Sequence, residues 1–169
     1  MIDMNEEIKR ERQVVSIDSL MPFLIERIQS GQSVRFSPRG ISMLPMIRQE
    51  IDSVVLSPVS GKLKKYDLPL YRRDNGNYIL HRIVRVGKTY TCIGDNQFDL
   101  EKGIEHGQVL AVVTAFYRGD KLHSTNELGY RLYCRFWHYS RFPRHVWRSL
   151  RYRTARLWRR IFGKQTKER

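Results

Sequence analysis

The chain has 169 residues, of which 41% are hydrophobic, and a formal net charge of +14 at pH 7. That length is enough for one domain with its own hydrophobic core and an additional segment. No run of about eighteen apolar residues is present, which argues against a transmembrane helix, and residues 1–13 lack the apolar stretch of a secretory signal. We therefore expect a cytoplasmic protein with neither a signal peptide nor a transmembrane span.

The first 32 residues predict a polar tail followed by a short helix. Residues 1–15 are polar, and we expect them to be frayed. Residues 16–31 then fit a helix, because serine or aspartate can cap its start, Pro22 is tolerated in a first turn, and Gly31 can end it.

From residue 33 onward the pattern changes to short segments rich in β-branched residues and separated by proline and glycine. These segments predict strands at 33–40, 53–59, 67–73, 77–86, 89–94 and 108–118. Asp74-Asn75-Gly76 and residues 86–89 are typical of tight hairpin turns. No helical pattern interrupts residues 33–117, so we expect a mainly β, antiparallel sheet or barrel-like domain over 33–122.

Three residues in this domain could form a catalytic set. Ser42 lies in the string GISMLP, His81 in LHRIV and Asp95 in GDNQFD. A serine hydroxyl needs a base within hydrogen-bond reach, histidine supplies one near neutral pH, and a carboxylate can orient the imidazole. The alternative for His81 is a hydrogen-bonded core histidine, because strand alternation places it on one face with Ile79 and Ile83.

Four short strings together resemble the catalytic domain of the S24/S26 serine peptidases, which comprise signal peptidases and self-cleaving repressors. They are Gly-x-Ser-Met-x-Pro at 40–45, KYDLPLYRR at 65–73, HRIV at 81–84 and GDN at 94–96. The similarity extends from about residue 37 to 116. It implies a mainly β, signal-peptidase-type fold and a serine endopeptidase activity.

The resemblance also implies roles for individual residues. Ser42 matches the nucleophile, with its backbone N–H as an oxyanion donor, and Met43 matches the hydrophobic neighbour of the substrate cleft. His81 stands where many members have lysine, which is similar to the signal peptidases of the endoplasmic reticulum and archaea. Asp95 is then the orienting carboxylate, with Asp99 as the alternative.

Other residues mark departures from the family pattern or minor roles. Asp67 is expected to order the start of its strand rather than perform chemistry. Gly40 stands where many signal peptidases carry a hydroxyl that helps bind the oxyanion, so that donor is missing. We expect the usual membrane anchor to be absent, and we do not expect a repressor role, because the forty residues ahead of Ser42 are few for a DNA-binding domain plus a linker.

Metal and cofactor chemistry are not expected. Cys92 and Cys134 are too few and too isolated for a zinc site or a disulfide framework, and the five histidines show no ligand spacing.

The C-terminal segment 128–169 differs from the rest in charge. It holds thirteen Lys and Arg against one acidic residue, a net charge of +12, together with all three tryptophans, whereas residues 1–127 carry +2. Residues 118–129 are typical of turn and linker. We expect Pro143 to separate a helix at about 128–141 from a later one, whose apolar stripe would comprise Val146, Trp147, Leu150, Ala155, Leu157, Trp158 and Ile161.

Three interpretations of this basic extension stay open. It could lie on an anionic membrane surface at the inner face of the cell membrane, pack on the β domain or a protein partner, or bind nucleic acid through phosphate contacts. The expected function is therefore a Ser-His serine endopeptidase, a hydrolase acting on a peptide or protein, that its basic tail brings to a membrane. The alternative is an inactive peptide- or partner-binding module of the same fold.

Overall fold

The computed structural model describes residues 17–147, 150–151 and 154. The predicted frayed tail at 1–15 and the stripe residues Ala155, Leu157, Trp158 and Ile161 lie outside the described residues. The predicted N-terminal helix is confirmed as α1 (Ile17–Gln29). Its Met21 and Ile28 are buried, at a helical spacing of seven, and Gly31 ends it with a positive φ of 89°.

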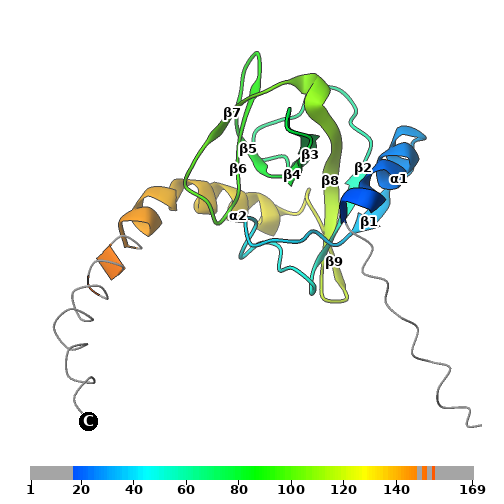
Figure 1. Ribbon diagram of the computed structural model, residues 1–169. Helices are drawn as coiled ribbons and strands as arrows, with labels where there is room; N and C mark the ends of the chain where they lie inside the picture. The colour runs from blue at the N-terminus through cyan, green and yellow to red at the C-terminus, as the bar shows by residue number, and fades with distance from the viewer. Residues whose placement is uncertain (1–16, 148–149, 152–153, 155–169) are drawn as a thin grey trace, which may run out of the picture.

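The mainly β fold is also confirmed (Figure 1). Two antiparallel sheets contain the strands β1 (Val34–Phe36), β2 (Ser53–Ser57), β3 (Pro69–Arg72), β4 (Tyr78–Leu80), β5 (Arg82–Val86), β6 (Tyr90–Ile93), β7 (Glu101–Ile104), β8 (Val109–Arg118) and β9 (Lys121–Ser124). The six-stranded sheet has the order β1-β2-β8-β3-β4, with β9 added alongside β8, and the three-stranded sheet has the order β5-β6-β7. Within the described residues the sheets stay open and do not close into a barrel.

The single strand predicted at 77–86 is divided between the two sheets. Tyr78–Leu80 pairs with β3, whereas Arg82–Val86 pairs with β6, and His81 stands at the junction. The backbone of Ile83 also exchanges hydrogen bonds with Tyr66 (2.8 Å) and Asp67 (2.9 Å) at the start of β3. His81 is therefore held at the point where the chain passes from the six-stranded sheet to the three-stranded sheet.

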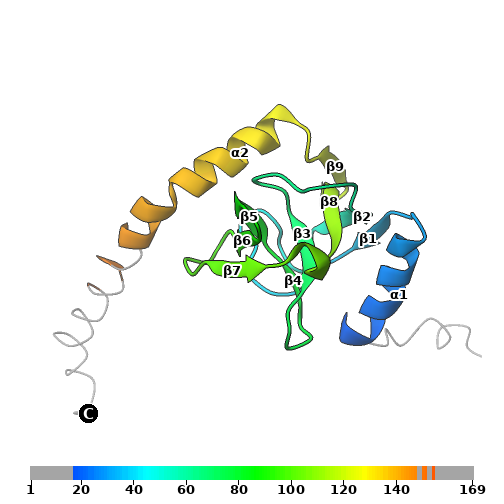
Figure 2. The ribbon, with the colours of Figure 1, turned by 90° about the horizontal axis from the view of Figure 1, so that it is seen from above.

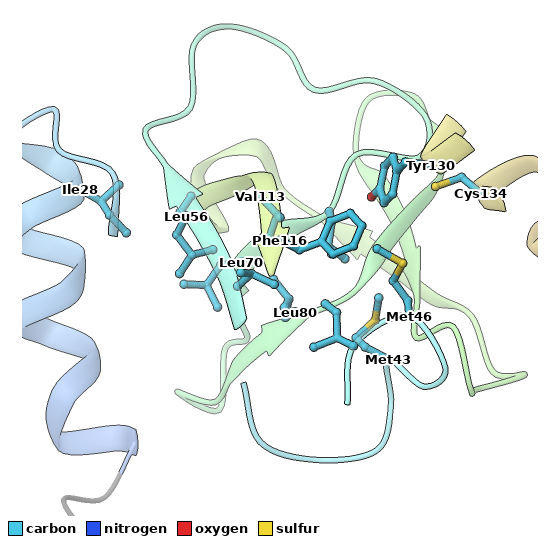
Figure 3. Close-up of a cluster of buried hydrophobic side chains, with 14 of the residues drawn as sticks. Ile28, Met43, Met46, Leu56, Leu70, Leu80, Val113, Phe116, Tyr130 and Cys134 are labelled. Carbon is cyan, nitrogen blue, oxygen red and sulfur yellow. The ribbon is translucent and has the colours of Figure 1, made fainter. Parts of the chain in front are cut away.

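Two hydrophobic clusters form the core. The larger joins α1, the six-stranded sheet, the turn that contains Ser42, and the helix α2 (Leu128–Tyr139) (Figure 3). Met43 and Met46 enter it from the Ser42 turn, and Tyr130 and Cys134 enter it from α2. The smaller cluster surrounds Tyr71 and Ile83 between the two sheets.

The C-terminal helix begins against the β domain and then leaves it (Figures 1 and 2). In both views α1 and α2 lie on opposite sides of the sheets. α2 ends at Tyr139, and helix resumes over 141–147. Pro143 thus lies in the first turn of the second helical stretch, where its missing N–H is tolerated. Among the helices that the structure describes, none has the length and hydrophobicity needed to span a bilayer.

Candidate active site

Ser42 lies on a compact turn that is anchored by its apolar neighbours. Met43 and Met46 are buried in the core, whereas the Ser42 side chain is half-buried at the surface. Within the turn, the Leu44 N–H donates to the Ile41 carbonyl (3.2 Å), and the Ile47 N–H donates to the Met43 carbonyl (3.0 Å). The apolar residues around the serine therefore hold its backbone in place while its side chain stays partly exposed.

The GDN string holds the same turn from the other side. The Asn96 N–H donates to the Ser42 carbonyl (2.8 Å), and the Asn96 side-chain amide donates to the Ile41 carbonyl (3.2 Å). A Cβ at Gly94 would stand only 2.6 Å from the Ser42 carbonyl oxygen. Glycine is thus required for this close approach, and the two strings form one structural unit.

His81 is buried, with 4% of its surface exposed, and its Nδ1 faces a carboxylate. Nδ1 lies 3.3 Å from the Tyr71 hydroxyl and 3.4 Å from Glu101 Oε2. The Tyr71 hydroxyl donates its proton to Glu101 Oε2 (2.6 Å), and Arg73 Nη2 donates to the same oxygen (2.7 Å). Because both acceptors around Nδ1 are oxygens without a spare proton, the favoured tautomer carries its proton on Nδ1.

The ionisation of this network suits a neutral histidine beside a charged carboxylate. Burial lowers the pKa of His81 below its usual 6.5, and the negative charge of Glu101 only partly opposes this. Burial disfavours the Glu101 carboxylate, but hydrogen bonds from Arg73 and Tyr71 outweigh it and lower the pKa of Glu101. Burial also raises the pKa of Tyr71, so that this hydroxyl stays a donor.

Ser42 and His81 line one pocket of about 140 Å³ between α1, β1 and the β3–β4 hairpin. Its other walls are mostly apolar and include Met21, Met43 and Leu80. Within the described residues no hydrogen bond joins the Ser42 hydroxyl to His81, and the Ser42 N–H donates to no acceptor. Ser42 and His81 therefore share one cavity, and the backbone N–H of Ser42 is unpaired within the part of the chain that the structure describes.

The structure places Asp95 against Arg82. Arg82 Nε and Nη2 donate to the two carboxylate oxygens at 2.8 and 2.7 Å, and both side chains are only 2% exposed. Arg82 Nη1 donates to the Tyr130 hydroxyl (2.8 Å) and approaches Cys134 Sγ (3.0 Å), both on α2. The Asp95 carbonyl accepts a hydrogen bond from Trp137 Nε1 (2.7 Å). These contacts join α2 to Arg82, which follows His81, and to Asp95, which precedes Asn96.

The other predicted carboxylates lie elsewhere. Asp99 is exposed and borders a shallow depression shared with Arg73 and Glu101, and no contact joins it to His81 in the described part of the chain. Asp67 accepts a hydrogen bond from the Lys64 N–H (2.7 Å), as expected of a residue that orders the start of a strand. Gly40 has a φ of 99° and donates its N–H to Gln49 (2.9 Å).

Glu101 and Tyr71 were not predicted as site residues from the sequence. Tyr71 lies within KYDLPLYRR, and Glu101 lies two residues beyond Asp99. The signal that could have found Glu101 was its place in a carboxylate-rich segment after GDN. Comparison of the chain with protein-family models, with curated proteins and with solved structures found no match.

Proposed function

We propose that this protein is a serine endopeptidase of the S24/S26, signal peptidase-like type, with Ser42 as nucleophile and His81 as general base. The observation that carries the proposal is the shared pocket: Ser42, on its anchored turn, and His81, with a carboxylate at Nδ1, line the same cavity. The order of the four sequence strings supports the same assignment.

The tautomer of His81 determines the first step. With the proton held on Nδ1, Nε2 presents its lone pair and takes the Ser42 proton as Oγ attacks the peptide carbonyl carbon. The Glu101 carboxylate stabilises the imidazolium that results. In this mechanism Glu101 takes the orienting role that the sequence assigns to Asp95, while Asp95 neutralises Arg82.

The remaining steps follow from the same groups. The unpaired Ser42 N–H stabilises the oxyanion of the tetrahedral intermediate. His81 then protonates the leaving amine as the C–N bond breaks, and water, deprotonated by His81, hydrolyses the acyl-enzyme. The mostly apolar pocket walls favour a small or medium apolar side chain next to the scissile bond.

A second candidate function is peptide binding without cleavage. The observation that favours it is the missing hydrogen bond between the Ser42 hydroxyl and His81. Binding would use the apolar pocket and would require neither side chain.

Reaction with a fluorophosphonate probe separates the two functions. We expect the wild type to be labelled, Ser42→Ala to be unlabelled, and His81→Ala to be labelled at least about 10²-fold more slowly. Ser37→Ala is the matched control, since Ser37 is exposed and outside the pocket, and its labelling should equal that of the wild type. Labelling that persists in Ser42→Ala would refute the nucleophile, and an unlabelled wild type would favour the binding module.

A further inference from the structure

A row of exposed apolar side chains follows one side of the C-terminal helical segment. Two of them, Phe136 and Phe142, are 69% and 77% exposed. The row, here called the apolar stripe, comprises Leu128, Leu132, Phe136, Tyr139, Phe142, Val146 and Leu150. Its steps of three and four residues place these side chains on a single face, since i→i−4 hydrogen bonds from Ser140 to Phe136 and from Arg144 to Ser140 carry the helical path across the turn at Ser140. The stripe therefore begins at Leu128, well before the position expected from the sequence.

The β domain cannot cover this stripe. The opposite face of α2 already packs on the β domain through Tyr130, Cys134 and Trp137. Beyond Tyr139 this opposite face still meets the β domain, because the rings of His145 and Phe98 lie 4.6 Å apart, and only the end of the helical segment projects away from the sheets (Figure 2). The stripe is thus held outward by the contacts that fix the other face of the helix.

Cations flank the stripe on one side. Arg131 and Arg135 are exposed on α2, and with Lys64 and Lys65 they line a pocket of about 520 Å³. Lys65 Nζ lies 5.9 Å from the ring of Tyr139, a member of the stripe. The one carboxylate of this pocket, Asp67, accepts a hydrogen bond from the Lys64 backbone.

Among the described residues, no carboxylate forms an ion pair with Lys64, Lys65, Arg131 or Arg135, so these cations are open to an external anion. Residues 128–169 contain a single acidic residue, Glu168, against thirteen Lys and Arg. A nucleic acid would neutralise the cations but leave the apolar stripe in water, and a second copy would bury the stripe but bring like charges together. An anionic bilayer surface suits both the stripe and the cations, because acyl chains can bury the apolar stripe and headgroup phosphates can neutralise the cations.

We propose that the apolar stripe and its flanking cations dock this protein on the surface of an anionic membrane. The helical segment lies in the plane of the interface, with Tyr139 and Trp147 at headgroup level. The β domain then sits on the side of α2 that faces away from the lipid. This proposal goes beyond the peptidase function and does not depend on Ser42.

Sedimentation of the full chain with vesicles tests the proposal. One set of vesicles contains phosphatidylcholine alone, and the other contains equal parts of phosphatidylcholine and phosphatidylglycerol. We expect binding to the anionic set, with Leu132→Gln/Phe136→Gln weakening the partition coefficient at least tenfold and Arg131→Gln/Arg135→Gln weakening it about fivefold per arginine. Added salt should weaken binding of the wild type.

Matched controls keep the test specific. Ile51→Gln/Leu122→Gln changes two apolar residues outside the helix that are more than half exposed, as Leu132 and Phe136 are, and Ser42→Ala changes the proposed nucleophile. Both should bind as the wild type does, and circular dichroism should show each variant folded. Equal binding to both vesicle sets, or unchanged binding of the stripe variant, would overturn the proposal. The proposal would also be overturned if the wild type does not bind vesicles and instead dimerises, or binds RNA, through these residues.

Discussion

Replacing Asp95 by asparagine distinguishes a carboxylate that neutralises Arg82 from one that orients His81. The substitution keeps the shape of the side chain and leaves the backbone hydrogen bond from Trp137 intact, but it removes the charge that faces Arg82. Both partners are 2% exposed, so the guanidinium would stay buried without a counter-charge. Breaking a buried pair on one side costs about 3–5 kcal/mol.

Such a loss is a large share of the total stability of a small domain, which is about 5–15 kcal/mol. Urea unfolding at low temperature, followed by circular dichroism, gives the free energy of unfolding for wild type and Asp95→Asn. The double variant Arg82→Met/Asp95→Asn is the control, because it removes the orphaned charge, and the cycle should give a coupling energy of about 1–3 kcal/mol.

The same variant is then tested with the fluorophosphonate probe. A stability within about 1 kcal/mol of the wild type, together with lost labelling, would refute the assignment to Arg82 and return the orienting role to Asp95. A destabilised variant that is still labelled while folded would support Glu101 as the group that acts on His81.

Four further predictions concern the proposed active site. Glu101→Gln should slow probe labelling about 10²-fold or more while the protein stays folded, because the amide cannot stabilise the imidazolium, and an unchanged rate would remove Glu101 from the mechanism. Gly94→Ala should cost about 1–3 kcal/mol in urea unfolding by pushing on the Ser42 carbonyl, whereas Gly107→Ala, with open space around its Cβ, should cost less. The labelling rate should fall at acid pH with a midpoint below 6.5, because the buried His81 has a lowered pKa and acts as a base only when neutral. The same shift means that the unfolded chain binds a proton more readily, so stability should fall as the pH drops from about 6.5 through the pKa of folded His81, and a labelling midpoint above 6.5 would contradict both statements.

The local sequence pattern correctly predicted those helices and strands whose position does not depend on their partners in the fold. The helix over Ile17–Gln29 and most strands follow from periodicity and from glycine and proline breaks. The division at His81 does not, because no glycine or proline interrupts residues 77–86. It is set by pairing with β3 on one side and β6 on the other, which only the folded chain defines.

The missed strands and side chains have a similar cause. β7 reads Glu-Lys-Gly-Ile and β9 reads Lys-Leu-His-Ser, and neither has the β-branched alternation of a typical strand. Glu101 becomes a partner of His81 only because β7 carries it beside Tyr71. Arg82 gave no sign of burial in the sequence, since its partners Asp95 and Tyr130 are 13 and 48 residues away.

The contacts of α2 show that charge and packing divide this chain at different places. Composition separates a nearly neutral part from a basic one near residue 128, which on charge alone suggests a separate C-terminal segment. Yet Tyr130 and Cys134 complete the surroundings of Arg82, and Trp137 holds the carbonyl of Asp95, next to the residue that fastens the Ser42 turn. The basic segment is therefore not a detachable module: cutting the chain at the charge boundary would open the core beneath Ser42 and His81, although both residues lie on the other side of the cut.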